Sequence, residues 1–244
     1  MSAIESGEFA DAATLVSWAA SGRAGGASAG PFESLNLAEY VGDDPFMVVE
    51  NRRRMAGLVG LGTEDLAVIG AVHGAAVGLV TEGGPVDGVD ALVTTSHGVA
   101  LLALAADCVP LVIADSTAGV IAAVHCGWRG LGAGVVPATV AVMRDLGAVT
   151  LEAVVGPAIC AACYPVPADR VESLRRSLDH EVSDVACIDA GGRSFIDVRA
   201  GVTAQLAAQG IDSTQIAICT HESPDLFSYR RDAVTGRQGM IIRQ

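Results

Sequence analysis

Two histidines and one cysteine in this chain have side chains well suited to binding a transition metal. They are His73, Cys108 and His125. Imidazole and thiolate are good zinc ligands, and three protein ligands leave the fourth position of zinc open for water or substrate, as in catalytic sites. The three residues are therefore candidate ligands of a catalytic zinc site. Asp107, next to Cys108, is a candidate to orient a ligand or to take a proton from bound water.

Residue type and spacing alone leave other roles open. A histidine at a strand end is more often an ordinary polar terminus, and a cysteine in an apolar strand is usually a small core residue. Cys108 and His125 could instead be the nucleophile and base of an amide hydrolase. We expect His97 in a loop and His180 on a helix face, both without a role in the site, and His221 in a loop where it could line a pocket.

The other cysteines predict reduced thiols, because six cysteines scattered through 244 residues do not form the dense disulfide framework of a small secreted domain. Cys160 and Cys163 have the CxxC spacing of a redox couple or of half a zinc knuckle. The chain has no second CxxC, and the following Tyr164-Pro165 indicates a loop or the start of a strand. We therefore favour a structural role for this pair.

A β-hairpin is expected to position Cys108 and His125. Two β-rich runs, Val109 to Asp115 and Val120 to Cys126, flank turn-forming residues at 116–119. If Asp115 faces Val120, then Pro110 faces His125, and Cys108 is a diagonal neighbour of His125 on the same face, roughly 7–8 Å away at the backbone. A register slip of one residue would separate the pair.

A helix is expected from about Leu131 to Leu146, after the run Gly127-Trp128-Arg129-Gly130. Its N-terminus would offer free N–H groups to phosphate or a substrate oxygen. A second helix begins near Asp44-Pro45 and carries Asn51 and Arg52. Strands are expected at 66–72 and 89–95, and a Gly/Ser/Pro loop at 23–36.

Composition narrows the function classes. The chain has 15 basic and 28 acidic residues, a net charge of −13, which argues against nucleic-acid or anionic-membrane binding. Every basic residue is arginine, which excludes lysine Schiff bases and phosphate-loop lysines. Small aliphatic residues favour layered α/β packing, and without repeats or linkers we expect one domain over residues 1–244.

The first residues, MSAIESGEFADAATLV, carry acidic side chains where a secretory signal needs positive charge. The most apolar stretch, Gly98 to Ala106, is roughly half as long as a membrane-spanning helix. We therefore expect a cytoplasmic protein without a transmembrane segment.

Several motifs in order along the chain resemble one known family. They are SLNL (34–37), Asp44 with Asn51-Arg52, VHG (72–74), DALVT (90–94), ADCVP (106–110), HCGWRG (125–130), VGPAICAACYPV (155–166) and FSYRRDAVTGRQ (227–238). The pattern is similar to the purine nucleoside phosphorylases formerly called multicopper polyphenol oxidases or laccase-domain proteins. Departures are Ala71 and Cys126, where members often have Gln and Ala, and Ala162-Cys163, where many have adjacent cysteines. We assign no role to the extra thiol of Cys126.

The resemblance implies a single α/β domain with α/β/β/α layers and mixed sheets, related in fold to certain cysteine-hydrolase toxins. It implies zinc bound by His73, Cys108 and His125, with Asp107 beside the metal and Arg52 on substrate or phosphate. By the same motifs, Asn36, Arg129, Phe227 and Arg230 are expected to bind substrate. Copper could displace zinc in the same ligand set.

The resemblance also implies phosphorolysis of adenosine, inosine, guanosine and S-methyl-5′-thioadenosine, and hydrolytic deamination of adenosine. The expected partners are a purine nucleoside and phosphate, and the expected state is a monomer. The alternatives are cysteine-dependent amide hydrolysis, such as editing of cell-wall peptides, and copper-dependent polyphenol oxidation. Laccase chemistry needs several coppers with many histidine ligands, and five histidines, of which two lie in the expected site, cannot supply them.

Overall fold

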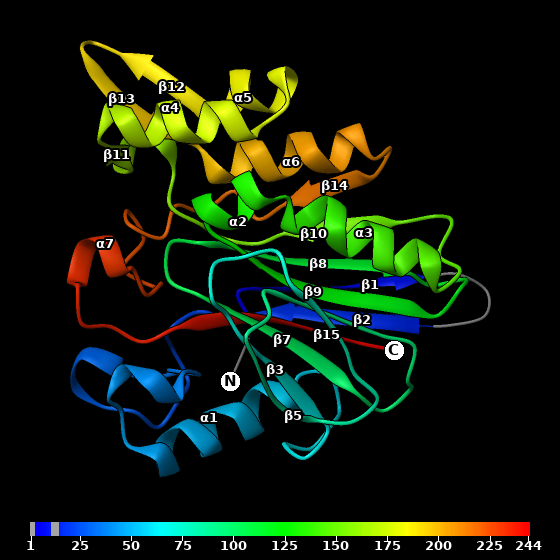
Figure 1. Cartoon of the computed structure of the whole chain (residues 1–244). Coiled ribbons are helices and arrows are strands. Elements are labelled where there is room, and N and C mark those ends of the chain that lie inside the picture. The colour runs from blue at the N-terminus through cyan, green and yellow to red at the C-terminus, as the bar shows by residue number, and fades with distance from the viewer. Residues whose placement is uncertain (1–2, 11–14) are drawn as a thin grey trace.

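Two six-stranded β-sheets lie face to face in the computed structural model, and helices cover their outer faces (Figure 1). The structure describes residues 3–10 and 15–244. None of the helices in these two ranges combines the length and apolar character needed to cross a bilayer.

The first sheet mixes parallel and antiparallel strands. Its central strands β7 and β15 pair antiparallel, whereas β3 runs parallel to β7. All side chains of β7 are buried, as expected for a strand covered on both faces. In spatial order the strands are β1 (Glu5–Ala10), β2 (Leu15–Ala20), β15 (Gln238–Arg243), β7 (Ala100–Ala105), β3 (Leu66–Gly70) and β5 (Gly84–Asp87).

The second sheet contains the predicted hairpin. In spatial order its strands are β14 (Asp212–Gln215), β10 (Glu152–Val155), β8 (Val109–Asp115), β9 (Val120–Cys126), β6 (Ala91–Thr94) and β4 (Val77–Leu79). Asp115 pairs with Val120 and Pro110 pairs with His125, which confirms the predicted register. The expected strands at 66–72 and 89–95 are observed in shorter form as β3 and β6.

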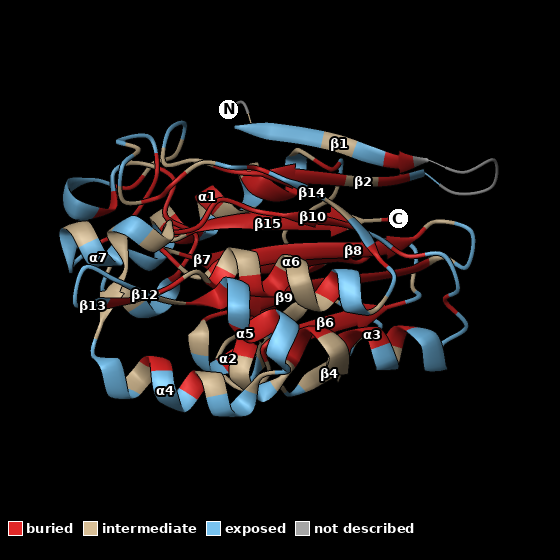
Figure 2. Cartoon of the chain, turned by 90° about the horizontal axis from the view of Figure 1, so that it is seen from above, coloured by how far each residue is buried: buried red, intermediate tan, exposed pale blue. Residues whose placement is uncertain are grey.

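Side chains alternate between two cores along the hairpin. On β9, Ile121 and Ala123 face the core between the sheets, whereas Ala122 and Val124 face the helix-covered side. The buried strands and the exposed outer faces of the helices show this layering directly (Figure 2). The predicted α/β/β/α architecture with mixed sheets is confirmed.

The helix expected at 131–146 is two helices. α2 (Trp128–Ala133) and α3 (Val135–Asp145) meet at Gly134, whose φ of +79° is left-handed and ends the first helix. Both pack on the second sheet. On the other side of the molecule, α1 (Pro45–Gly57) covers the first sheet, and the Asp44 side chain caps it by accepting from the N–H of Phe46.

Most of the remaining elements form a cap beside the second sheet, whereas the short helix α7 (Tyr229–Asp232) lies apart from this cap, at the side of the two large sheets (Figure 1). A small third sheet orders β11 (Pro165–Val166), β13 (Arg193–Ile196) and β12 (Cys187–Ala190). The helices of the cap are α4 (Ala168–Ser177), α5 (His180–Ala186) and α6 (Val198–Ala208). Within the described residues there are also three short 3-10 turns, η1 (Gly30–Phe32) in the predicted loop, η2 (Glu39–Val41) and η3 (Ala161–Cys163).

Candidate metal centre and substrate pocket

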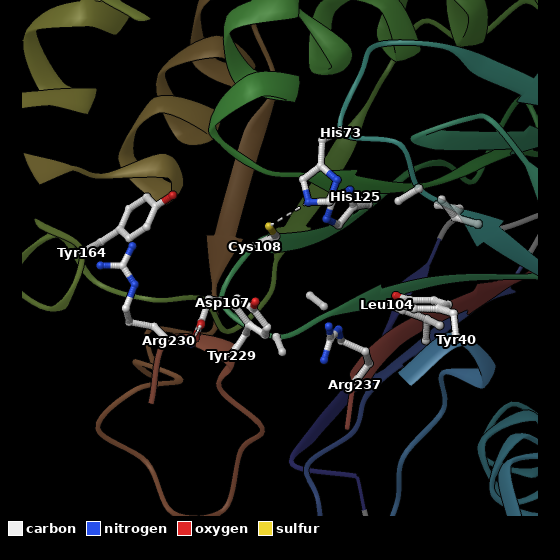
Figure 3. Close-up of a pocket in the computed structure, with 14 residues that line it drawn as sticks. Tyr40, His73, Leu104, Asp107, Cys108, His125, Tyr164, Tyr229, Arg230 and Arg237 are labelled. Carbon is white, nitrogen blue, oxygen red and sulfur yellow. Dashed lines mark hydrogen bonds between the residues drawn. The ribbon is translucent and has the colours of Figure 1, made fainter. Parts of the chain in front are cut away.

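The three predicted ligands meet at one end of the hairpin. His73 lies in the loop after β3, Cys108 directly precedes β8, and His125 is in β9. Their ligand atoms all lie within 4.8 Å of one another, and Cys108 Sγ is 3.9 Å from His73 Nε2 (Figure 3). The two imidazole rings stand nearly perpendicular, with centroids 4.8 Å apart. The structure thus places His73 beside Cys108 and His125, the two residues that the hairpin register had already brought together.

A fully buried carboxylate, that of Asp90, orients both histidines. Its Oδ1 lies 2.9 Å from His125 Nδ1 and accepts the backbone N–H of His73 at 2.8 Å. Its Oδ2 accepts the N–H of Gly74 at 2.6 Å. With Nδ1 of His125 held by a carboxylate, Nε2 of the same ring is left for a metal, which is the usual arrangement around metal-binding histidines. The bonds to residues 73 and 74 also hold His73 at its left-handed φ of +62°.

Gly127 leaves room for the cluster. A Cβ added at this position would lie 3.0 Å from Cys108 Sγ and 3.0 Å from His73 Cδ2. Contacts that short are crowded, so any larger residue would displace one of the two side chains. The glycine after His125-Cys126 is therefore part of the site.

The ligand set fits a zinc ion. In a tetrahedral zinc site, a sulfur and a nitrogen ligand lie about 3.5 Å apart, close to the 3.9 Å between Cys108 Sγ and His73 Nε2. Two neutral imidazoles and one thiolate are donors that zinc prefers, and three of them leave one position open. The second ring nitrogen of His125 is already held by Asp90, as a metal-bound histidine requires.

Electrostatics favour an ionised thiol at the centre. Burial raises the pKa of Cys108, but the nearby His125 charge and hydrogen bonds from both imidazoles outweigh burial and bring that pKa to about 6. Burial lowers the pKa of His125, yet the Cys108 charge and the bond to Asp90 raise it to about 9. A thiolate is the form of cysteine that binds metal or attacks as a nucleophile, so the site supports either chemistry.

Asp107 lies on the pocket wall, and its carboxylate is committed to the neighbouring loop. Its Oδ1 accepts the hydroxyls of Thr220 and Ser228, both at 2.7 Å, and its Oδ2 accepts the backbone N–H of Arg230 at 2.6 Å. Its φ of +88° is a strained conformation for a residue with a side chain, of the kind that functional sites retain. These contacts give Asp107 a positioning role, and its role as a proton carrier stays a prediction.

A cavity of about 480 Å³ opens over the cluster. This volume falls in the range of small-molecule sites. Figure 3 shows Tyr164 and Arg230 on one side of the cluster, with Arg237 and Tyr40 on the other and Tyr229 between them. Arg230 lies over the ring of Tyr164, 4.6 Å from its centroid. The cavity thus offers aromatic faces and guanidinium groups around the cluster.

Of the residues predicted to bind substrate, the structure brings Arg230 to this cavity. Arg52 lies on an adjoining cavity of about 280 Å³, where it donates to Glu39 Oε1 at 2.6 Å and to the carbonyl of Leu37 at 2.9 Å. The two cavities share the wall formed by Tyr40 and Leu104. The predicted contact of Arg52 with substrate or phosphate stays a prediction.

The other three predicted substrate residues do not line the cavity. Asn36 is fully buried, and its Oδ1 accepts the backbone N–H of Arg237 at 2.9 Å, so it supports the wall from behind. Phe227 is fully buried in the protein interior, and Arg129 is exposed and stacks on Trp128. The first residues of α2 are also not among those that line the cavity, and the expected phosphate site at this helix N-terminus stays a prediction.

Sequence reasoning missed Asp90, Arg237 and the three tyrosines of the wall as site residues. The motif DALVT already contained Asp90, and a carboxylate directly before an apolar strand was the available signal. Arg237 and Tyr229 lie within the quoted motif FSYRRDAVTGRQ. Tyr40 lies outside the quoted motifs, so no sequence pattern pointed to it.

The remaining histidines and Cys126 lie away from the cluster. His97 and His221 are in loops, and His180 is the exposed first residue of α5. Cys126 is buried in the core on the helix side of the second sheet, because it follows His125 on the strand and points to the opposite face. Its thiol is therefore a packing group, and burial raises its pKa well above the ordinary value.

Comparison with known proteins places this site in a family. Residues 17–244 match the family described as multi-copper polyphenol oxidoreductase laccase. A purine nucleoside phosphorylase of Streptomyces coelicolor is 46% identical over 222 residues, covering 88% of this chain and 90% of the relative. One of Corynebacterium glutamicum is 40% identical, covering 90% and 91%. An adenosine deaminase from an unknown prokaryotic organism is 33% identical and covers 82% of each chain.

Solved structures have the same fold. The crystal structure of Neisseria meningitidis protein NMB0706 superposes with a TM-score of 0.83 at 31% identity and covers 98% of both chains. The hypothetical protein YfiH of Bacillus licheniformis superposes with a TM-score of 0.85 at 24% identity, covering 97% of this chain and 98% of YfiH.

Proposed function

The chain belongs to the multi-copper polyphenol oxidoreductase laccase family, and we propose that it is a zinc-dependent enzyme that cleaves purine nucleosides with phosphate. The observation that carries the proposal is the cluster of His73, Cys108 and His125 beneath a cavity lined by tyrosines and arginines. Relatives at 46% and 40% identity that bear the name purine nucleoside phosphorylase support it.

The nucleoside would occupy the cavity above the cluster. Flat aromatic faces suit a purine ring, and Tyr40, Tyr164 and Tyr229 supply them. His73, Cys108 and His125 would hold zinc, which acts when bound as a Lewis acid and lowers the pKa of water. The buried carboxylate of Asp90 keeps the His125 ring in the orientation that such binding needs.

Phosphate would bind to the arginines of the wall. A guanidinium carries five N–H donors, and Nη1 of Arg237 donates to the carbonyls of Thr235 and Gly236 while Nη1 of Arg230 donates to that of Pro165. These bonds fix both groups at the edge of the cavity. Phosphorolysis needs phosphate positioned in line with C1′ of the ribose as the base departs, and positioning of this kind supplies much of the catalysis.

The substrates that we propose are adenosine, inosine, guanosine and S-methyl-5′-thioadenosine. A second activity, hydrolytic deamination of adenosine, is favoured by the relative named adenosine deaminase and by the open ligand position of a three-residue site. In that reaction water would attack C6 of the adenine, the bond from C6 to the amino group would break, and ammonia would leave, with Asp107 as the candidate proton carrier.

The test is a product assay. The purified enzyme is incubated with each nucleoside, with and without phosphate, and the free base, ribose 1-phosphate and inosine are quantified. We expect free base and sugar phosphate to appear together and only when phosphate is present. No product from any purine nucleoside at any metal loading would overturn the proposal.

Cysteine-dependent amide hydrolysis is the competing candidate, because the thiolate of Cys108 beside the His125 imidazolium also suits nucleophilic catalysis. Metal removal separates the two. Full amidase activity in metal-free protein, abolished by alkylation of Cys108, would favour the hydrolase. Copper could occupy the same three ligands, but they cannot form the several copper sites that laccase chemistry requires.

A further inference from the structure

A second group of potential metal ligands lies outside the catalytic cluster. Cys160 precedes the short turn η3 and Cys163 is its last residue, whereas Cys219 and Glu222 lie in the loop after β14. One ligand atom from each of the four residues lies within 4.8 Å of the others. The CxxC motif thus meets a third thiol and a carboxylate from a part of the chain 59 residues away.

Contacts hold the two loops together at this point. The N–H of Cys160 donates to Cys219 Sγ at 3.3 Å, and Cys163 Sγ lies 3.6 Å from Glu222 Oε1. Behind them, Ala158 and Cys219 form a parallel β-bridge, and the N–H of Thr220 donates to the carbonyl of Ala158. The four side chains are therefore brought together by ordered backbone rather than by chance on a surface.

We propose that these four residues form a second cation site, which binds Zn²⁺ through three thiolates and one carboxylate. Ligands of tetrahedral zinc lie about 3.8 Å apart when both are sulfur, so spacings within 4.8 Å need only small side-chain rotations. Four protein ligands close the coordination shell, which is the pattern of a structural site. Binding displaces the protons of the three thiols to solvent.

The surroundings suit a structural role. Cys219 is buried, Cys160 and Cys163 are half-buried, and Glu222 is exposed, so the site lies at the surface with one wall in the protein. The guanidinium of Arg231 donates to the carbonyls of Thr220, His221 and Ser223 and places a positive charge against the same loop. The same guanidinium is paired with the carboxylate of Asp232 at 2.8 Å, so its contribution here is to brace the loop that carries Cys219 and Glu222.

The site would connect two segments that reach the substrate pocket. Tyr164, next to Cys163, lines the cavity, and Thr220, next to Cys219, donates to Asp107, which also lines it. A metal that ties residue 163 to residue 219 therefore fixes the position of these two segments relative to each other. The inference does not depend on which reaction the pocket performs.

The experiment counts metal in the whole protein. Protein kept reduced is stripped of metal, reconstituted anaerobically with Co²⁺ or Zn²⁺, desalted, and analysed by elemental mass spectrometry and by the sulfur-to-cobalt charge-transfer band. We expect two equivalents in the unaltered protein. We expect one equivalent in His73→Ala. This variant should retain most of the charge-transfer intensity, because three of the four thiolates expected to bind metal belong to the second site.

Matched variants assign the second equivalent. Cys163→Ser and Cys219→Ser should each lose one equivalent and most of the charge-transfer band, whereas Cys187→Ser, which removes a buried thiol outside the cluster, should keep both. His73→Ala leaves the four proposed ligands intact, so it tests the site even if the cysteine variants fail to fold. Loss of all bound metal in His73→Ala, or a disulfide among the three thiols after reconstitution, would overturn the proposal.

Discussion

The carboxylate of Asp90 controls the geometry of the metal cluster although it touches no substrate. It binds the ring of His125 and the backbone of residues 73 and 74. We predict that Asp90→Asn weakens zinc binding by about 10–100-fold, because the amide is a poorer partner for the His125 N–H and releases the His73 loop. Competition with a chromophoric chelator measures the affinity.

The control for this variant is Asp212→Asn, which removes a carboxylate from an exposed position on β14. It should leave zinc affinity and turnover unchanged. Equal zinc affinity in Asp90→Asn and in the unaltered protein would show that His125 does not need its carboxylate partner to bind metal.

A substitution of Asp107 can show whether this residue positions the pocket or transfers a proton. Its three hydrogen bonds hold the loop that presents Arg230. We predict that Asp107→Asn raises KM for nucleosides by about tenfold in phosphorolysis and deamination alike, since one lost charge-assisted bond costs about 1.5–3 kcal/mol. Steady-state kinetics on both reactions provides the test. A loss confined to kcat of deamination, with a changed pH profile, would instead identify a proton carrier.

Cys108 and His125 were predictable from local sequence because strand alternation and one turn fix their relation. His73 was not, since its place depends on how the loop after β3 in one sheet reaches β9 in the other, and no local pattern encodes that approach. The family resemblance supplied it. Asn36 and Phe227 belong to matching motifs, but both are buried and neither lines the cavity. A sequence motif does not show which side chains face a cavity.

At the scale of elements, the hairpin that places the ligands depends on its turn. Asp115 is buried, and its carboxylate accepts the backbone N–H groups of Ala118, Val149 and Thr150. Burial raises the pKa of Asp115, but these bonds outweigh burial and lower it. The bonds tie the hairpin turn to the segment that leads into β10.

We predict that Asp115→Asn lowers the free energy of unfolding by about 2 kcal/mol at neutral pH. Because the folded-state pKa lies below the unfolded value of about 3.9, the carboxylate stabilises the fold fully above that value and loses its contribution as pH falls through the folded pKa. The difference between variant and unaltered protein, measured by urea unfolding, should therefore be constant from pH 6 to 8 and shrink in acid. A difference that grows as pH falls would contradict this assignment.

The turn between β9 and α2 sets the space for the cluster. Gly127→Ala would place a methyl group 3.0 Å from Cys108 Sγ and from His73 Cδ2. We predict that it weakens zinc binding by about tenfold or more, since overpacking costs about 1–3 kcal/mol. Gly57→Ala, at the end of α1, adds the same methyl group where nothing lies within 4 Å and should leave zinc binding unchanged. Isothermal titration with Zn²⁺ on both variants decides the point.

The presence of helices and strands was easier to predict from sequence than the residues at which they end. The hairpin register and the start of α1 at its Asp44 cap followed from local rules, whereas the helix expected at 131–146 breaks at Gly134. Glycine is tolerated within helices, so local sequence could not show whether this one ends a helix. The packing of α2 and α3 on the second sheet decides it.

At the scale of the whole molecule, the pocket lies where loops from both sheets meet. His73 follows a strand of the first sheet, and Cys108 and His125 belong to the second, so the catalytic cluster joins the two layers. Pairing between the sheets was beyond local sequence patterns because it depends on contacts distant in the chain.

The most direct test of the zinc-dependent phosphorolysis is turnover as a function of bound metal. Metal-free protein is titrated with Zn²⁺, and release of hypoxanthine and ribose 1-phosphate from inosine and phosphate is followed, with His73→Ala beside it. We predict that turnover rises with zinc and saturates, and that His73→Ala stays inactive at every zinc concentration while its fold, followed by circular dichroism, is kept. Undiminished turnover without metal, or in His73→Ala, would contradict the zinc site as the centre of the reaction.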